Sequence, residues 1–421
     1  MYVQRELENK LKKYLKSPEI IAILGARQVG KTTLLQNFFN TENSLMISFE
    51  DREKLSHFQE DEKSFADYYL DKCDILIIDE FQYAREGGKK LKYIFDNYPG
   101  KKIIISGSSS LELTEQAAKY LVGRIFQFQL NSFSFSEVLR HEDIQLYEQL
   151  YKAADQLKEF TQIKDYKLPI VPSALISKAL QILDEYIIFG GYPRVVLSEN
   201  AEEKETVLHN IYNTYLIKEI REILNIENDF EMEKLTKSLG LRIADLINLN
   251  EISNFMGMNV RKVQQLIHVL EKTFIIQLSN PFYTNKLLEL SKSKKLFFRD
   301  SGFRNAVIKN FTNQDSRTDT ADLYENFIFE ETHKKNIETK YWRTKSKAEV
   351  DLIIEKNGEI IPVEIKSNLK RSSIQKSLHS FIKKYVPARA FVVSRDYFDF
   401  KKINSTDVLF IPFPLFVLID F

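Results

Sequence analysis

A glycine-rich segment near the N-terminus places the strongest constraint on the fold. Residues 25–32, GARQVGKT, have the spacing G-x-x-x-x-G-K-[ST], and they follow the apolar run 20–24. The two glycines let the backbone turn tightly enough for successive N–H groups to converge on one anion. The helix expected after the segment adds the positive end of its dipole at the same point. The segment therefore predicts a phosphate-binding loop between a strand and a helix.

The side chains of this loop predict a nucleotide rather than free phosphate. Lys31 is expected to reach the β- and γ-phosphates, and the Thr32 hydroxyl to ligate Mg²⁺. ATP and Mg²⁺ are therefore the cofactors that we expect. The predicted nucleotide-binding residues of the loop are Gly25, Arg27, Gln28, Val29, Gly30, Lys31, Thr32 and Thr33.

Two later segments fit the same site. The stretch CDILIIDEFQ ends an apolar run in Asp79 and Glu80. Asp79 is expected to hold Mg²⁺, and Glu80 to polarise the attacking water, which is the Walker B pattern. The stretch IIISGSSS, residues 103–110, ends in hydroxyls, and Ser108 is the candidate sensor of the γ-phosphate. A helix N-cap is the alternative for both the acidic and the hydroxyl positions.

Hydrophobic patterning divides the chain into four parts. Short apolar runs at 20–24, 45–49, 75–78, 103–106 and 125–130 predict a parallel α/β sheet. Residues 141–225 read as helical, broken by FGGYPR at 189–194. Residues 226–285 predict helices around a turn at Gly257 and a short β-pair, that is, a winged helix-turn-helix. We expect a multidomain α/β protein with domains at 1–140, 141–225, 226–285 and 286–421.

Together these motifs resemble a bacterial and archaeal family of AAA-type ATPases. GARQVGKTTLL, IIDEFQ, SGSSS and LVGR (121–124) match its core, FGGYP matches its lid, and the C-terminal region resembles the domain of unknown function DUF4143. The resemblance implies ATP hydrolysis, with a lid Gly-x-Pro ending in Pro193 against the adenine. It also implies that Arg124 or Arg27 senses the γ-phosphate, in its own subunit or across a homo-oligomer interface. A plain turn and ordinary surface arginines are the alternatives.

A second constellation lies in WRTKSKAEVDLIIEKNGEIIPVEIKS, residues 342–367. It predicts two strands joined by a turn at 357–358, and an antiparallel pairing brings Asp351 close to Glu364. Strand alternation places Glu364 and Lys366 on one face. Two carboxylates that converge with a lysine can hold a divalent metal and orient a water. Charge pairing across the hairpin for stability alone is the alternative.

This arrangement is similar to the PD-(D/E)XK nuclease superfamily. The resemblance implies that Asp351 and Glu364 ligate metal, and that Lys366 and Glu325 complete the catalytic set. The proline that usually precedes the first aspartate is replaced by Val350. The fourth domain, 286–421, is therefore expected to be nuclease-like.

Basic residues indicate DNA as the partner. Residues 286–421 carry an excess of Lys and Arg, whereas residues 1–285 carry an excess of Asp and Glu. The predicted recognition helix, NVRKVQQLIHVLEK, carries polar side chains suited to bases and phosphates. The candidate phosphate contacts are Lys334, Lys335, Arg343, Lys345, Lys347, Lys376, Lys383 and Lys384.

The remaining composition predicts a cytoplasmic protein without membrane contact. The single cysteine, Cys73, permits no internal disulfide and fits a reducing compartment. The first residues are too charged for a signal peptide. The apolar end VLFIPFPLFVLIDF is short and broken by two prolines, which favours a buried strand over a membrane span.

The sequence thus favours an ATP-dependent protein that binds or processes DNA. One alternative keeps the ATPase but treats the C-terminal domain as a binding platform without cleavage. The other is a nucleotide switch whose winged helix docks a protein partner.

Overall fold

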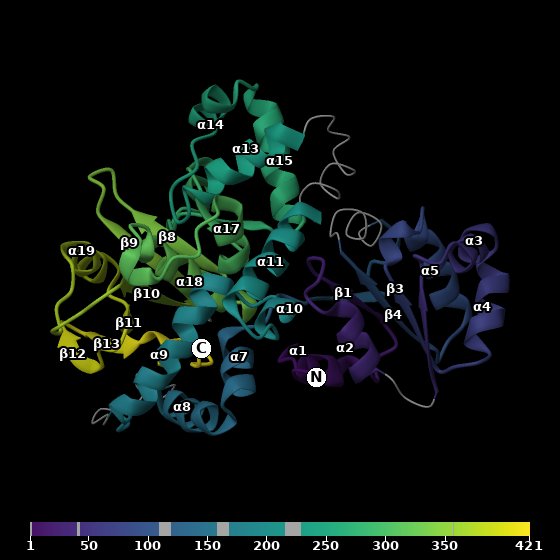
Figure 1. Ribbon diagram of the computed structural model, residues 1–421, viewed down its shortest axis with the longest axis horizontal. Helices are drawn as coiled ribbons and strands as arrows, with labels where there is room; N and C mark the ends of the chain where they lie inside the picture. The colour runs from purple at the N-terminus through teal and green to yellow at the C-terminus, as the bar shows by residue number, and fades with distance from the viewer. Residues whose placement is uncertain (1, 40–42, 109–118, 158–167, 215–228, 357) are drawn as a thin grey trace. The chain divides into compact units, whose positions relative to one another are not determined.

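The computed structural model describes residues 2–39, 43–108, 119–157, 168–214, 229–356 and 358–421 (Figure 1). The chain divides into two compact units, residues 1–133 with 268–275 and residues 134–267 with 276–421. The four predicted domains, 1–140, 141–225, 226–285 and 286–421, do not coincide with these two units, because residues 268–275 of the first unit lie within the third predicted domain. None of the described helices combines the length and apolar character that a membrane span requires.

The first unit is built on a five-stranded sheet. Its strands lie in the order β2-β3-β4-β1-β5, and every neighbouring pair is parallel. All five strands predicted from the apolar runs are confirmed, within one residue at each end. Their bounds are β1 (Ile20–Leu24), β2 (Ser44–Ser48), β3 (Ile75–Asp79), β4 (Lys102–Gly107) and β5 (Ile125–Gln129). Isoleucine-rich strands such as β1 and β4 are buried along their whole length, as expected for a sheet covered on both faces.

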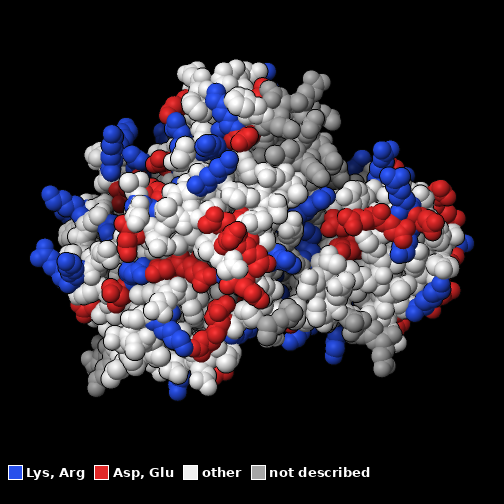
Figure 2. Space-filling view, in the orientation of Figure 1, with Lys and Arg blue, Asp and Glu red and all other residues white. Residues whose placement is uncertain are grey.

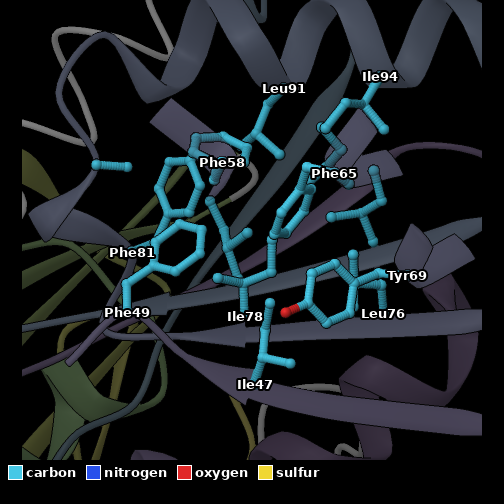
Figure 3. Close-up of a cluster of buried hydrophobic side chains, with 14 of the residues drawn as sticks. Ile47, Phe49, Phe58, Phe65, Tyr69, Leu76, Ile78, Phe81, Leu91 and Ile94 are labelled. Atoms are coloured by element: carbon cyan, nitrogen blue, oxygen red, sulfur yellow. The ribbon is translucent and has the colours of Figure 1, made fainter. Parts of the chain in front are cut away.

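Helices cover this sheet, and aromatic side chains fill the space between (Figure 3). Phe49 follows β2, Phe58 and Phe65 come from α3 and α4, and Phe81 follows β3. The rings of Phe49 and Phe58 lie 5.0 Å apart between centroids. This packing holds the carboxyl ends of β2 and β3 in place. The helices of the unit are α1 (Leu7–Tyr14), α2 (Lys31–Phe38), α3 (Arg52–Glu60), α4 (Glu62–Leu70), the 3₁₀ turn η1 (Phe81–Tyr83) and α5 (Gly87–Asn97).

The second unit begins with helices. Its first helix, α7 (Phe135–Glu142), begins before the segment 141–225 that we expected to be helical. That segment contains α8 (Ile144–Gln156), α9 (Ser173–Phe189), α10 (Pro193–Val196) and α11 (Ala201–Ile211). The Gly-Gly-Tyr-Pro segment ends α9, as predicted, because Gly190 adopts a positive φ of 73°.

The end of α9 interlocks with the start of α17 (Ser301–Ile308). A Cβ on Gly190 would lie 2.1 Å from Asp300 Oδ1, and one on Gly302 would lie 1.9 Å from the carbonyl oxygen of Phe189. Asp300 accepts a hydrogen bond from the Gly191 N–H at 2.9 Å, and it caps α17 by accepting from the Phe303 N–H. FGGYP and the segment FRDSG (298–302) therefore form one joint, which we call the glycine joint.

Asn305 completes the glycine joint. Its side-chain amide is fully buried and donates to the carbonyls of Ile187 and Ile188, at 3.1 and 2.9 Å. These carbonyls belong to the last turn of α9, where intrahelical donors run out. The joint thus satisfies backbone groups that burial would otherwise leave unpaired.

The predicted helix-turn-helix segment contains α13 (Asp229–Gly240), α14 (Leu249–Met256) and α15 (Val260–Lys272). Gly257 joins α14 to α15 with a φ of 68°. Val263, Leu266 and Leu270 are buried, whereas the polar positions 261, 264, 265 and 268 are exposed. The strand β6 (Ile276–Ser279) pairs antiparallel with β7 (Lys295–Phe298), with α16 (Lys286–Ser291) between them. The β-pair therefore extends past residue 285, where we expected it to end.

The C-terminal part of the second unit is a six-stranded mixed sheet in the order β12-β13-β11-β10-β9-β8. Strands β9 and β10 form the predicted antiparallel hairpin, and β10 runs parallel to β11. Gly358 of the predicted turn has a φ of 81°, whereas Asn357 lies outside the described residues. The strands are β8 (Thr339–Arg343), β9 (Glu349–Lys356), β10 (Glu359–Lys366), β11 (Arg389–Ser394), β12 (Asp399–Ile403) and β13 (Thr406–Pro412).

The same part of the chain also contains helical elements. They are η4 (Gln314–Ser316), α18 (Thr320–Lys334), α19 (Lys376–Tyr385) and α20 (Phe413–Phe416). Trp342, Phe381 and Phe410 pack together with the aliphatic side chains of the strands. The apolar C-terminus forms β13 and α20, both almost wholly buried, so its hydrophobicity is explained by packing within the protein.

Candidate functional site: a phosphate loop and a carboxylate cluster

The glycine-rich loop connects β1 to α2, as predicted. A Cβ on Gly25 would lie 2.2 Å from the carbonyl oxygen of Leu130, so the start of the loop has room only for glycine. Gly30 stands immediately before α2 with a φ of 92°, and Gln28 also adopts a positive φ, of 62°. These left-handed residues turn the backbone so that α2 begins at Lys31 with its N-terminus at the loop.

Lys31 is buried, and its ammonium donates hydrogen bonds to neutral backbone carbonyls of the loop. Nζ donates to the carbonyls of Gly25 and Ala26, at 3.0 and 2.9 Å. Burial lowers the pKa of Lys31 to about 8, although Glu80 and Asp79 act in the opposite direction. A buried cation held by neutral carbonyls is a site that an anion can stabilise.

Thr32 and Asp79 meet at the start of α2 and the end of β3. Thr32 Oγ1 donates to Asp79 Oδ2 at 2.7 Å, and Ser106 Oγ at the end of β4 donates to Asp79 Oδ1. A hydroxyl and a carboxylate in contact beside a phosphate loop are the oxygen ligands that Mg²⁺ takes. These residues fit the ion that the sequence predicts.

Glu80 follows Asp79 in a left-handed backbone conformation, with a φ of 55°. Its N–H donates to Asp79 Oδ1 at 3.1 Å, so its backbone is held by the Asp79 carboxylate. Ser108 is buried at the end of β4, and the side chain of Gln82 lies between Glu80 and Ser108. The predicted water-polarising and sensor residues are therefore neighbours. Ser109 and Ser110 lie outside the described residues.

A cavity of about 660 Å³ opens beside these groups, on the side of β2 and α2. Thr32, Asp79 and Glu80 all line it. The predicted metal ligands and the predicted water-polarising residue thus face open space rather than packed side chains. The rest of the lining is Leu35, Gln36, Ser44, Met46, Ile47, Ser48, Glu50, Lys54 and Ile77.

Three other predicted nucleotide contacts lie in the loop or directly after it. The Arg27 guanidinium is 3.4 Å from the Tyr83 hydroxyl, and Val29 is buried with its carbonyl accepting from Arg5 at 2.9 Å. Thr33 is exposed on the first turn of α2.

Arg124 and Pro193 lie elsewhere. Arg124 precedes β5, and its carbonyl accepts from the N–H of Ile20, so it lies at the amino end of the sheet, opposite the loop. Its guanidinium bonds both oxygens of Asp96, at 2.8 and 3.2 Å. The prediction that Arg124 senses the phosphate in its own subunit is therefore wrong, because the length of β1 separates the two. Pro193 lies in the second unit, as the first residue of α10 beside the glycine joint.

The second cluster lies on the β9–β10 hairpin. Asp351 Oδ2 accepts from the Ile365 N–H at 2.7 Å, which places Asp351 beside Glu364 as the predicted register requires. Lys366 Nζ lies 2.7 Å from Glu364 Oε1. Three of the four predicted side chains thus come together at the carboxyl end of β10.

Glu325 on α18 reaches the same cluster through a lysine that we did not predict. Lys295 on β7 has a side chain only 4% exposed, and Nζ lies 2.6 Å from both Glu325 Oε1 and Glu349 Oε1. These carboxylates, with Asp351 nearby, hold the pKa of Lys295 above its usual value despite burial. Lys295 therefore supplies the cluster with a second cation besides Lys366.

Burial dominates the electrostatics of these carboxylates. It raises the pKa of Glu364 to about 7, with the charge of Asp351 adding to the effect, and the pKa of Glu325 to about 8, against the effect of Lys295. Glu364 Oε2 is buried and accepts no hydrogen bond from the described residues. An unpaired carboxylate oxygen beside a second carboxylate fits a divalent cation. However, the described residues contain no group of three or more His, Cys, Asp or Glu side chains arranged around a metal position.

The candidate DNA contacts differ in exposure, and two of them, Lys335 and Arg343, are partly buried. Lys345, Lys347, Lys376, Lys383 and Lys384 are exposed. Figure 2 shows basic side chains projecting from this edge of the second unit and runs of acidic ones elsewhere on the same face. Lys334 is instead enclosed by Glu330 and Glu331, with Nζ at 2.5 and 3.2 Å from their oxygens. Its prediction as a phosphate contact is wrong, because the side chain is only 5% exposed.

Sequence reasoning missed three polar residues that touch these sites. Ser106 and Gln82 stood inside the quoted motifs, and their place at or just after the end of a buried strand is the signal that could have found them. Lys295 offered no such signal, since a lysine in KKLFF reads as a solvated strand end.

The parallel sheet in the order 2-3-4-1-5, with its first loop cradling a buried lysine and an acidic pair at the end of β3, defines a P-loop NTPase. The sequence matches the AAA domain family AAA_14 over residues 17–139 and the DUF4143 family over residues 321–416. A third family, the domain of unknown function DUF8612, matches residues 180–314, which include the glycine joint. The chain thus joins an AAA-type ATPase domain to a DUF4143 domain, as the resemblance implied.

Similar proteins extend along most of the chain. An uncharacterized protein of Haemophilus influenzae is 22% identical over 97% of this chain and 96% of its own length. An uncharacterized protein of Methanocaldococcus jannaschii is 25% identical over 86% of this chain and 77% of its own length. The similarity to these two proteins therefore covers most of each chain.

Solved structures are more distant. A signal transduction ATPase with numerous domains (STAND) from Pyrococcus horikoshii shares 13% identity over 79% of this chain, with a TM-score of 0.28, and the chain spans only 46% of its length. Cdc6p from Pyrobaculum aerophilum shares 11% identity over 74% of this chain and 96% of its own, with a TM-score of 0.25. Similarities this weak carry no functional argument.

Proposed function

We propose that the protein uses ATP hydrolysis in its AAA domain to bind and process DNA, and that its DUF4143 domain cleaves a DNA strand. The observation that carries this proposal is the meeting of Asp351, Glu364 and Lys366 on the β9–β10 hairpin, where one buried carboxylate oxygen has no hydrogen-bond donor in the part of the chain that the structure describes. Such a set, in a chain that also holds a phosphate loop, fits metal-dependent phosphodiester hydrolysis.

In the AAA domain, different residues would bind the phosphates, hold Mg²⁺ and orient the attacking water. The N–H groups of residues 25–33 and the ammonium of Lys31 would bind the phosphates, and Lys31 would leave the Gly25 and Ala26 carbonyls to do so. Thr32 and Asp79 would hold Mg²⁺, which neutralises charge that develops on the phosphates. Glu80 would orient the attacking water from the wall of the adjoining cavity.

In the DUF4143 domain Asp351 and Glu364 would hold a divalent metal, which supplies a more acidic bound water and polarises the phosphate. Lys366 would contact the phosphate or the attacking water, since its Nζ already lies beside Glu364. Lys295 would keep Glu325 and Glu349 neutralised, so that only Asp351 and Glu364 require the metal. The exposed lysines at 345, 347, 376, 383 and 384 would bind the DNA backbone.

The helices α13–α15 with the β6–β7 pair would act as a winged helix. The exposed face of α15 carries Arg261, Gln264, Gln265 and His268, which suit contacts in a DNA groove. Lys262 is less available, because Nζ lies 2.6 Å from Glu231.

Two measurements on the full chain test the proposal. The first compares ATP hydrolysis with and without single-stranded, duplex and branched DNA, at several salt concentrations. The second measures nicking of supercoiled DNA with Mg²⁺ or Mn²⁺. We expect nicking to be lost in Asp351→Ala and retained in Lys31→Ala. Absence of DNA binding at low salt, with a hydrolysis rate that no DNA changes, would favour a nucleotide switch that docks a protein instead.

A second candidate keeps DNA binding without cleavage. It is favoured by the buried Lys295, which already supplies a cation to Glu325, and by the lack of a group of three potential ligands among the described residues. Salt-sensitive DNA binding without any metal-dependent nicking would select this candidate over the first.

A further inference from the structure

Gln82 lies between the two groups that are expected to detect and attack the γ-phosphate. It belongs to η1, the short turn after β3, and its amide points at the end of β4. Nε2 donates to Glu80 Oε2 and lies 3.2 Å from Ser108 Oγ, while Oε1 accepts from the Ser108 N–H at 3.3 Å. One side chain therefore contacts both residues.

The chemistry of the partners determines how this amide is oriented. The Glu80 carboxylate only accepts hydrogen bonds, and the Ser108 N–H only donates. The NH₂ group of Gln82 must therefore face Glu80, and its carbonyl oxygen must face the backbone of Ser108. A glutamate at position 82 has the same shape but no donor, so it would meet Glu80 with a second negative charge.

The backbone leaves the Glu80 side chain dependent on such a partner. Glu80 stands in a left-handed conformation at the strand end, with its N–H directed to Asp79 Oδ1 and Ser106 Oγ. These contacts fix the backbone of Glu80 but not its carboxylate, which is separated from it by three rotatable bonds. In the described structure, Gln82 supplies a hydrogen bond that fixes the carboxylate.

We propose that Gln82 is a positioning residue that links the sensor hydroxyl of Ser108 to the orientation of Glu80. When the Ser108 hydroxyl turns toward a γ-phosphate, its contact with Gln82 Nε2 is released, and that donor is left to Glu80 alone. Glu80 then keeps its hydrogen bond from Gln82 while triphosphate is bound, and this amide is no longer shared with the Ser108 hydroxyl. Gln82 therefore sets the rate of hydrolysis and leaves the affinity for ATP unchanged. This inference rests on the proposed role of the AAA domain in hydrolysing ATP.

The test compares Gln82→Glu and Gln82→Ala with wild type for ATP dissociation constant, kcat and thermal midpoint. We expect kcat to fall roughly 10- to 100-fold in both variants, because misplacing a catalytic group costs about that much. The ATP dissociation constant is expected to stay within about threefold and the thermal midpoint to stay unchanged, since the P-loop contacts remain. Retained ATP binding shows that the variants are folded.

A matched control and a double substitution sharpen the test. Gln59 donates to the carbonyl of Tyr83 in the same turn, at 3.4 Å, without contacting Glu80 or Ser108, so Gln59→Ala should leave kcat unchanged. Ser108→Ala should lower kcat clearly less in the Gln82→Ala background than in wild type, because linked residues are not additive.

The possible failures are distinguishable. If wild type hydrolyses ATP and Gln82→Glu does so at the same rate, this inference is wrong and the ATPase proposal stands. A parallel loss of ATP affinity and kcat would also overturn it, by making Gln82 part of nucleotide binding. If wild type binds ATP without hydrolysing it, the proposed ATPase function fails, and this inference fails with it.

Discussion

The P-loop and the carboxylate cluster both bury charged side chains, but the buried charges have opposite signs. In the P-loop a buried ammonium, Lys31, is held by neutral carbonyls, and burial lowers its pKa. In the cluster, buried carboxylates accumulate, and burial raises the pKa of Glu364 and Glu325. One site is therefore stabilised by an added anion, and the other by an added cation.

The buried lysines of the two sites, Lys31 and Lys295, also differ in their partners. Lys31 has no carboxylate in hydrogen-bond contact among the described residues, whereas Lys295 contacts two. We infer that Lys31 binds a ligand and that Lys295 stabilises the fold. Substitutions at these positions should therefore separate activity from stability.

The largest expected effect is on ATP turnover in Lys31→Met. Loss of the ammonium removes the main positive charge at the β- and γ-phosphates, and kcat/KM should fall at least about 100-fold. The free energy of unfolding without nucleotide should change little, because only bonds to carbonyls are lost. Steady-state hydrolysis and denaturant unfolding measure the two quantities. Lys101→Met, at the amino end of β4, serves as the control; an equal loss in both variants would contradict the assignment.

Lys295→Met should have the largest effect on stability. It leaves Glu325 buried without the cation that it shares with the partly exposed Glu349, which should cost about 3 kcal/mol in the free energy of unfolding. Urea unfolding of the full chain, monitored by the fluorescence of Trp342, measures this free energy. Lys402→Met removes an exposed partner of Asp407 and should cost less than about 0.5 kcal/mol. Equal, small effects would mean that Lys295 is not structural.

Glu364→Gln should raise the free energy of unfolding, whereas Lys295→Met should lower it. The substitution removes a buried negative charge with one unpaired oxygen, so the metal-free protein should gain about 1 kcal/mol of stability. Wild type should also gain thermal stability on addition of Mn²⁺, and the variant should not. Thermal unfolding with Mn²⁺ or with a chelator measures both. A metal-induced rise that persists in Glu364→Gln would place the metal at another site.

The smallest effect is expected for Arg124→Ala. Arg124 bonds Asp96 at the end of the sheet away from the loop, so the ATP dissociation constant should change by less than about twofold. Binding measured at protein concentrations low enough to prevent association tests this. A fall in kcat that appears only at high protein concentration would indicate a contact across subunits.

The nucleotide site was largely predictable because its parts are local. The loop 25–32 carries its own strand, turn and helix start, and Asp79–Glu80 follows directly from a buried strand. The Asp351–Glu364 pair was predictable for a similar reason, since one hairpin register places both side chains.

Contacts between distant segments were not predictable in this way. Lys295 reaches Glu325 and Glu349 from a strand of another sheet, and nothing in KKLFF marks it as buried. The partner strand of β6 lay beyond the expected domain end, because α16 intervenes. The place of Arg124 at the amino end of the sheet was also not predictable, because the motif LVGR does not show which end of the sheet it occupies.

The glycine joint has a consequence for synthesis of the protein. Gly191 and Asp300 are 109 positions apart, and the last carbonyls of α9 obtain their donors from Asn305. A growing polypeptide must therefore expose α9 with an uncapped end until residue 305 has left the ribosome. Products truncated before that point would keep this end open to water and to proteases, so premature termination there should yield chains that are degraded rather than partly active.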